Sequence, residues 1–126
     1  MKSGLILFAH GARDARWAAP FEAVAARVRA QRPEVAVRLA FLEFMSPSLQ
    51  AAGTELASLG CHRVQVLPLF LGAGGHVRED LPLLVVDALR NAHPGMAVTL
   101  QPAVGELDSV TAAIADAALQ LLDSAR

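Results

Sequence analysis

The feature that most constrains this chain is a regular alternation between short apolar runs and longer amphipathic segments. Continuous apolar runs are typical of strands that are covered on both faces, and we expect strands at Leu5–Phe8, Val35–Leu42, Arg63–Leu69 and Ala97–Leu100. Apolar residues at helical spacing predict helices at Pro20–Gln31, from Ser46–Pro47 to Gly60, from between His76 and Leu81 to Asn91, and at Glu106–Leu122. Helical crossovers between strands favour a parallel sheet. The predicted fold is therefore α/β: a single three-layer domain over residues 1–126, with a four-stranded parallel sheet and helices on both faces.

Local sequence signals predict the ends of one of these helices and the buried face of another. Ser46–Pro47 is typical of an N-cap followed by proline in the first turn, and Gly60 of a helix stop. In the last helix, Leu107, Val110, Ile114 and Leu121 fall on one face, which we expect to point into the core.

Composition excludes several classes of function. The formal net charge is -1, so no overall field attracts nucleic acid, and no stretch reaches the roughly 18 apolar residues of a membrane helix. The single cysteine, Cys61, excludes an internal disulfide or a cysteine-based zinc cluster and fits a cytoplasmic protein. Because 54% of the residues are hydrophobic and 18% charged, the chain can fill a core, and a buried subunit interface is a further possibility.

Residues with metal-binding side chains follow three successive predicted strands. His10 follows the first strand, Glu43 ends the second, and His76 follows the third after the turn Gly72–Gly75. Ligands of open parallel sheets bind outside the carboxyl ends of the strands, so these side chains are expected to converge on one edge. Imidazole and carboxylate can bind a transition metal and can also accept protons.

Each of these features can also serve a purely structural purpose. His10 can simply close a strand, Glu43 can pair with an arginine, and His76 can cap a helix. The turn Gly72–Gly75 can hold a phosphate at a helix N-terminus, but it lacks the Walker A residues. Its glycines can equally let a large flat ligand approach the backbone. His62 and His93 are expected at the opposite edge, as solvated turn residues.

Three segments carry a resemblance to a known family: Leu7–Asp14, Phe41–Leu49 and Leu67–Pro82. Over essentially its whole length the chain resembles the small sirohydrochlorin chelatases of the CbiX/SirB type, which belong with the class II tetrapyrrole chelatases. The resemblance implies a metal chelatase that places Co²⁺, or in some members Fe²⁺ or Ni²⁺, into sirohydrochlorin without ATP, toward cobalamin or sirohaem. The metal is then a substrate, and no tightly bound cofactor is expected.

The resemblance also implies roles for individual residues. It places His10 and His76 at the metal and Glu43 in the catalytic site, while Phe44–Ser46 departs mildly from the usual pattern. Arginines would hold the carboxylates of the substrate, and the candidates are Arg13, Arg16 and Arg78. The macrocycle would approach the backbone closely at Gly74 and Gly75. Short members of the family pair as homodimers that rebuild the two similar halves of the larger members, so a homodimer is expected.

Two other functions stay open: a metal or tetrapyrrole carrier without catalysis, and a metal-dependent phosphate-ester hydrolase.

Overall fold

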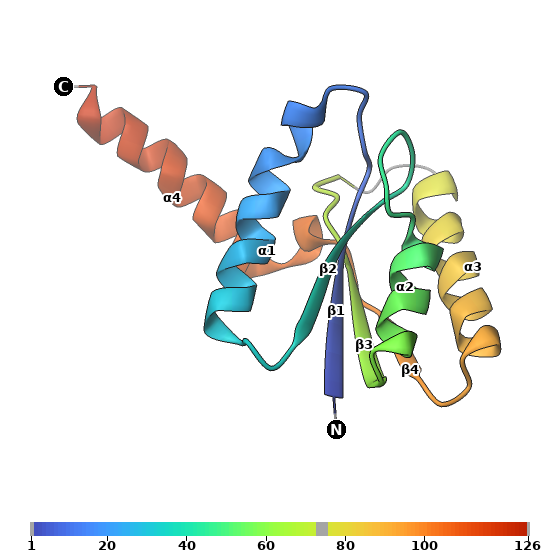
Figure 1. Cartoon of the computed structure of the whole chain (residues 1–126). Coiled ribbons are helices and arrows are strands. Elements are labelled where there is room, and N and C mark those ends of the chain that lie inside the picture. Colours follow the sequence, from blue (N-terminus) through green and yellow to red (C-terminus); the bar gives the residue numbers. More distant parts are fainter. Residues whose placement is uncertain (1, 73–75, 126) are drawn as a thin grey trace.

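The computed structural model describes residues 2–72 and 76–125, with the backbone alone over residues 76–82. Its centre is a parallel sheet in the order β2-β1-β3-β4 (Figure 1). The strands are β1 (Lys2–Ala9), β2 (Ala36–Phe41), β3 (Cys61–Pro68) and β4 (Ala97–Leu100). The predicted α/β fold with a four-stranded parallel sheet is confirmed.

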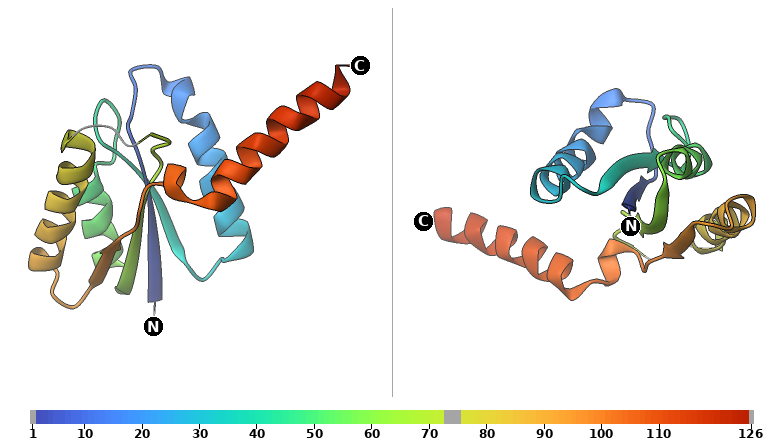
Figure 2. Two further views of the ribbon diagram at one scale, coloured as in Figure 1. Left: turned by 180° about the vertical axis from the view of Figure 1, so that it is seen from behind. Right: turned by 60° about the horizontal axis from the view of Figure 1, so that its bottom comes forward.

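Helices lie on both faces of the sheet (Figure 2). On one face is α1 (Ala19–Gln31), preceded by the 3₁₀ turn η1 (Ala15–Ala18). The other face carries α2 (Leu49–Ser58) and α3 (His76–Ala92). After β4, the 3₁₀ turn η2 (Val104–Glu106) leads into α4 (Asp108–Ser124). In the described part of the chain, no helix is long and apolar enough to cross a membrane.

The larger part of the core lies between the sheet and the α2–α3 layer. Side chains of alternate strand residues point into it, and Val86 and Leu89 of α3 close it from outside. Phe8 meets Phe70 there edge to face, with ring centroids 5.9 Å apart. The buried residues of this cluster are Ile6, Phe8, Ala40, Leu49, Ala52, Leu56, Cys61, Val64, Val66, Phe70, Val86, Leu89, Met96 and Val98.

The face beneath α1 is less completely buried. Leu7, Ala25 and Val37 form a small buried cluster, but the apolar residues packed around it keep part of their surface exposed. In the described elements, α1 packs over β2 and β1 and leaves the α1-side face of β3 and β4 without a helix. The two faces of the sheet are therefore unequally covered.

Two local predictions were wrong. The N-cap of α2 is Ser48, whose hydroxyl accepts a hydrogen bond from the Ala51 N–H at 3.1 Å, and not Ser46. The carbonyl of Pro47 accepts from the Phe41 N–H at 2.9 Å, which ties this segment to the end of β2 and delays the helix. In α4, the predicted inward face is not covered: none of its residues, all of which the structure describes, is buried.

Candidate functional site

The site begins where the central strand ends. β1 lies between β2 and β3, so the residue that follows it, His10, stands in the middle of the carboxyl edge of the sheet. Pairing continues past the strands, because the Leu42 N–H donates to the Ala9 carbonyl at 2.9 Å and the Glu43 N–H to the His10 carbonyl at 3.1 Å. These two hydrogen bonds hold the segments after β1 and β2 side by side and bring Glu43 next to His10.

The two side chains meet as the strand-end positions predict. Nε2 of His10 lies 3.6 Å from Oε1 of Glu43, and the two side chains are 37% and 47% exposed. The other ring nitrogen, Nδ1, lies 3.3 Å from the Gly11 carbonyl oxygen. A carbonyl can only accept a hydrogen bond, so this contact favours the tautomer with the proton on Nδ1. The lone pair of Nε2 then faces the carboxylate across a solvent-accessible gap.

Gly11 makes this close approach possible. Its φ is +95°, a conformation that residues with a Cβ rarely adopt, and an added Cβ would collide with the carbonyl of Glu43. The glycine is therefore required by the same backbone contact that pairs His10 with Glu43.

Sequence reasoning missed an aromatic side chain at the rim, Phe44. Its φ is +67° and its ring is 56% exposed, which are both uncommon for a bulky apolar residue. The Met45 N–H donates to the Glu43 carbonyl at 2.8 Å across this tight turn. The guanidinium of Arg13 lies over the ring, 5.0 Å from its centroid. No pattern in the sequence indicates this pairing, because it depends on a turn that phenylalanine seldom makes.

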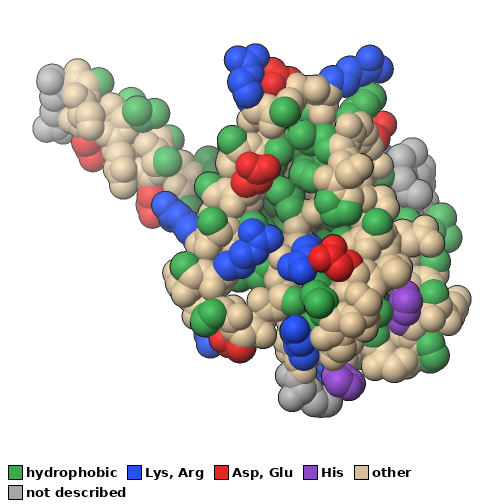
Figure 3. Space-filling model, in the orientation of Figure 1, with side chains coloured by type: hydrophobic (Ala, Val, Ile, Leu, Met, Phe, Trp, Pro, Cys, Tyr) green, Lys and Arg blue, Asp and Glu red, His purple; other side chains and the backbone are tan. Residues whose placement is uncertain are grey.

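The second candidate arginine, Arg16, is engaged locally. Its guanidinium donates to the Asp14 carboxylate at 2.7 Å, and its backbone N–H donates to the same carboxylate at 2.9 Å. The guanidinium first, and the backbone N–H second, lower the pKa of Asp14, while the carboxylate raises the pKa of Arg16. Figure 3 shows basic and acidic side chains together at this upper end of the molecule. Arg13 thus contacts the residue next to Glu43, whereas Arg16 contacts Asp14.

The remaining candidates cannot be placed beside this pair. Gly74 and Gly75 lie outside the described residues, as do the side chains of His76 and Arg78. The backbone of α3 begins at His76, as predicted. Among the side chains that the structure does describe, no three His, Cys, Asp or Glu residues cluster as a metal site. Among the candidate residues whose side chains the structure describes, His10 and Glu43 are therefore the two that it brings together.

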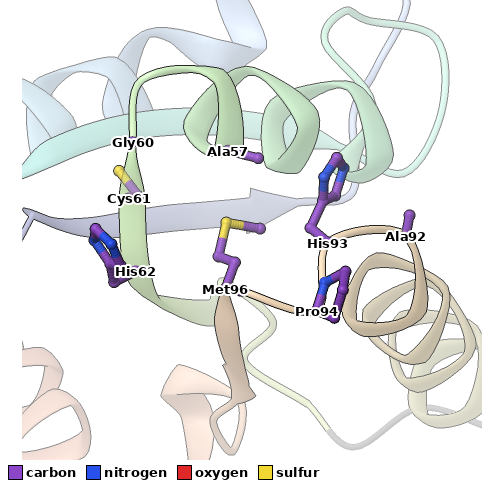
Figure 4. Close-up of a pocket in the computed structure, with 9 residues that line it drawn as sticks. Ala57, Gly60, Cys61, His62, Ala92, His93, Pro94 and Met96 are labelled. Carbon is purple, nitrogen blue, oxygen red and sulfur yellow. The ribbon is translucent and has the colours of Figure 1, made fainter.

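The other two histidines lie at the amino-terminal edge of the sheet, away from His10. His62 and His93 line a shallow cavity of about 390 Å³ with Cys61 and Met96. Figure 4 shows the two imidazoles on opposite sides of Met96 and not pointing toward each other. His93 contacts the hydroxyl of Thr54 at 3.5 Å. This arrangement offers no converging pair of ligands like that of His10 and Glu43.

The sequence as a whole matches the model of the CbiX family over residues 4–121. The chain belongs to the CbiX family. Among curated relatives of this CbiX chain, the sirohydrochlorin cobaltochelatase of Methanococcoides burtonii is 26% identical over 91 residues, which are 71% of this chain and 70% of the relative. That of Methanothermobacter thermautotrophicus is 32% identical over 81 residues, 64% of this chain and 56% of the relative. With several relatives, the matching segments thus cover less than two thirds of the relative's own length.

Solved structures share the fold of this CbiX chain. The CbiX protein of Marinobacter aquaeolei VT8, named for cobalamin (vitamin B12) biosynthesis, superposes with a TM-score of 0.82 at 31% identity, covering 97% of this chain and 98% of that one. SirB from Bacillus subtilis with Fe³⁺ gives a TM-score of 0.73 at 22% identity, covering 92% of this chain but 46% of SirB. The likeness to SirB shows the fold alone, and that fold occupies less than half of the SirB chain.

Proposed function

We propose that this chain is a sirohydrochlorin chelatase that inserts a divalent metal ion, Co²⁺ or Fe²⁺, into a polycarboxylated tetrapyrrole without ATP, in cobalamin or sirohaem biosynthesis. The proposal is supported by membership of the CbiX family and by the activity for which its curated relatives are named. The observation that carries it is the contact of 3.6 Å between His10 and Glu43 at the carboxyl edge of the sheet.

The geometry of this pair suits the binding of a metal ion that is then transferred to the macrocycle. Two ligands that each bind a metal at about 2.1 Å in a tetrahedral arrangement lie about 3.4 Å apart. The gap of 3.6 Å between Nε2 of His10 and Oε1 of Glu43 is close to that separation and too long for a hydrogen bond. Both side chains are partly exposed, so a hydrated ion can reach them and exchange its waters. His76 is proposed as the further ligand, on the basis of the family resemblance.

Insertion also requires two pyrrole N–H protons to leave the macrocycle. A neutral imidazole or a carboxylate can accept them, so His10, Glu43 and His76 are the candidate catalytic residues. With Nδ1 of His10 directed to the Gly11 carbonyl, Nε2 is the atom that would bind the metal or take the proton. Once the metal has moved into the macrocycle, the protons can be released to solvent through the exposed side of the pair.

The rim of the site suits the substrate's shape and charge. Guanidinium groups bind carboxylates with two parallel hydrogen bonds, and Arg13 lies over the ring of Phe44, the residue that follows Glu43. The exposed ring of Phe44 adds a flat apolar surface against which a macrocycle can lie. Arg16 and Arg78, with Gly74 and Gly75, complete the proposed substrate-binding set.

We also infer a homodimer and a cytoplasmic location. The homodimer is supported by the family resemblance and by the apolar side chains exposed on α4. A cytoplasmic location is supported by the single cysteine, Cys61, which is buried as a free thiol.

An anaerobic absorbance time course tests the chemistry. Sirohydrochlorin is mixed with Co²⁺, Fe²⁺ or Ni²⁺, with and without protein, and formation of the metallated product is followed. The wild type is expected to accelerate insertion, and His10→Ala and Glu43→Gln to lose most of that acceleration. His62→Ala is the matched control, because His62 is exposed at the opposite edge of the sheet.

Three outcomes are informative. Acceleration by the wild type and His62→Ala, but not by His10→Ala, supports the proposal and ranks the metals. Wild-type turnover by the folded His10→Ala protein would exclude His10 as a metal ligand. Binding of the tetrapyrrole without any acceleration would favour the carrier function instead.

A further inference from the structure

One face of the sheet is only half covered. Parallel sheets are normally buried on both faces, because their crossover helices lie against them. Here α1 covers the β2–β1 half of its face, and the described elements put no helix over the β3–β4 half. Residues of β3 and β4 on this side, such as Gln65 and Thr99, are exposed, while their neighbours Val64 and Val98 are buried on the other side.

An apolar patch borders this open half. The flank of α1 toward β2 carries polar residues, and Arg29 donates there to the Val37 carbonyl at 2.8 Å. The opposite flank, toward β3, carries Val24 and Val28, of which Val24 is 42% exposed. The floor beside it is formed by Leu5 and Leu67, which are only partly buried. We call this surface the α1 patch: Phe21, Val24 and Val28 with Leu5 and Leu67.

The same chain carries an apolar helix that no described element covers. On α4 and its flanks, apolar side chains recur every three or four residues on one face, and hydrophobic side chains are visible along this arm in Figure 3. The opposite face carries Asp116 and Asp123. The α4 stripe consists of Leu107, Val110, Ile114, Ala117, Ala118 and Leu121.

The start of α4 is fixed so that the helix leaves its own domain. Gly105 of η2 donates to the Phe70 carbonyl at 3.0 Å, and an added Cβ at Gly105 would collide with the backbone of Leu71. The turn is therefore seated tightly against the segment after β3. From it α4 runs outward, and among the described elements η2 is the one with which it makes extensive contact (Figure 1). The α4 stripe and the α1 patch of one chain thus lie apart.

We propose that two copies of this chain exchange their α4 helices, each copy laying its α4 stripe on the α1 patch of the other. A second copy is the occupant that the structure favours, because in the described part of each copy both the apolar face of α4 and the α1 patch are uncovered. A two-fold axis satisfies both surfaces at once. The proposal specifies the interface of the proposed homodimer and does not depend on the metal chemistry.

The exchanged helices by themselves bury an area near the minimum for a specific interface. A helix of 17 residues is about 25 Å long and about 10 Å wide, so its footprint on a facing surface is about 250 Å². Two exchanged helices, each burying about 250 Å² of its own surface and as much of the facing patch, remove roughly 1,000 Å² from water. That value is at the threshold for a biological interface, and any contact between the two domains adds to it.

A pair of matched substitutions on α4 tests the proposal. Ile114, in the stripe, and Leu119, on the other side of the helix, are 53% and 56% exposed. Ile114→Glu places a charge in the proposed interface of both protomers, whereas Leu119→Glu places the same charge outside it. By sedimentation, the wild type and Leu119→Glu are expected at twice the chain mass of 13.3 kDa. The dimer Kd of Ile114→Glu is expected to rise at least about 100-fold, with an unchanged circular dichroism spectrum.

Cysteine cross-linking tests which surfaces meet. Val24→Cys and Ile114→Cys are made on separate chains, co-expressed and oxidised; Cys61 is buried and serves as the common background. A disulfide between the two variants supports the exchange, because it can form only between copies. A disulfide formed mainly between two Ile114→Cys chains would show α4 pairing with α4 and would overturn the proposal.

Other results would also overturn it. These are a monomeric wild type at concentrations of about 100 μM, or a dimer of Ile114→Glu as tight as that of the wild type. All these measurements are made without metal or tetrapyrrole. A failure of the interface is therefore distinguishable from a failure of the insertion chemistry, which the absorbance time course measures separately.

Discussion

Replacing Gly11 with alanine perturbs the backbone contact that holds His10 against Glu43. Gly11 has a φ of +95°, and an added Cβ would collide with the Glu43 carbonyl. An L-residue forced into a left-handed conformation costs about 1–2 kcal/mol. Relief of the collision separates the two segments and breaks the bond of 3.1 Å from the Glu43 N–H to the His10 carbonyl, which costs about 1 kcal/mol more.

The expected result is a loss of about 2–3 kcal/mol in the free energy of unfolding, which lowers Tm by about 10 °C. Urea denaturation followed by circular dichroism measures the first quantity, and a thermal scan the second. Metal insertion is expected to fall with it even at temperatures where the variant stays folded, because the gap between His10 and Glu43 widens.

Gly95→Ala is the matched control for this substitution. An added Cβ at Gly95 meets no atom within 4 Å, and the residue lies at the opposite edge of the sheet. Its free energy of unfolding is expected to change by less than about 1 kcal/mol. If Gly11→Ala matched Gly95→Ala in both stability and turnover, the close approach of the two segments would not be what sets the site.

The core and the rim of the site give three further predictions. Phe8→Ala is expected to lower the free energy of unfolding, measured by urea denaturation, by about 3–5 kcal/mol, because Phe8 is 2% exposed and packs on Phe70. A loss under about 1 kcal/mol would contradict that packing. Phe44→Ala is expected to change the free energy of unfolding by less than about 1 kcal/mol, because it loses one exposed contact with Arg13. The same substitution is expected to weaken tetrapyrrole binding in a fluorescence titration, and unchanged binding would show that Phe44 is not part of the substrate-binding surface. In a carbon-13 NMR titration, the Asp14 carboxyl is expected to titrate below 3.8, because Arg16 depresses its folded pKa. The stabilisation from this pair is then present above that pH and is lost as the pH falls through the lower folded value, and Arg16→Gln should return the midpoint toward 3.8.

The order of the elements could be predicted from sequence because the central strand is buried on both faces. Leu5–Phe8 is a continuous apolar run since β1 has neighbours on both sides and layers on both faces, and a run of this length is typical of such a strand. The position of His10 followed from the topology, because the carboxyl ends of parallel strands share one edge. Its contact with Glu43 required only that β1 and β2 be neighbours.

The features that could not be predicted depend on tertiary contacts, which the spacing of apolar residues does not specify. The stripe through Val110 and Ile114 indicates that one face of the last helix is to be covered, but the same pattern results whether the cover is the chain's own core or another molecule. The start of α2 was misplaced because Ser46 and Ser48 are equally good caps by residue type. The choice between them is made by the Pro47 carbonyl, which is bonded to β2. Phe44 was missed for a similar reason, since its backbone conformation is imposed by the turn after Glu43.

The strand order has a consequence for how the chain folds. β1 sits at the centre of the sheet, but one of its two partners, β3, is about sixty residues further along, with Lys2 paired to Cys61. A pairing between segments so distant in sequence loses a large loop-closure entropy before its contacts form, and such pairings slow folding. The β1–β2 unit with α1 can form first, because its contacts are nearer in sequence, and it presents the open edge of β1 as a template. Addition of β3 should therefore be the rate-limiting event in refolding, and substitutions at Val64 and Val66 should slow refolding more than substitutions at Val98 on the last strand.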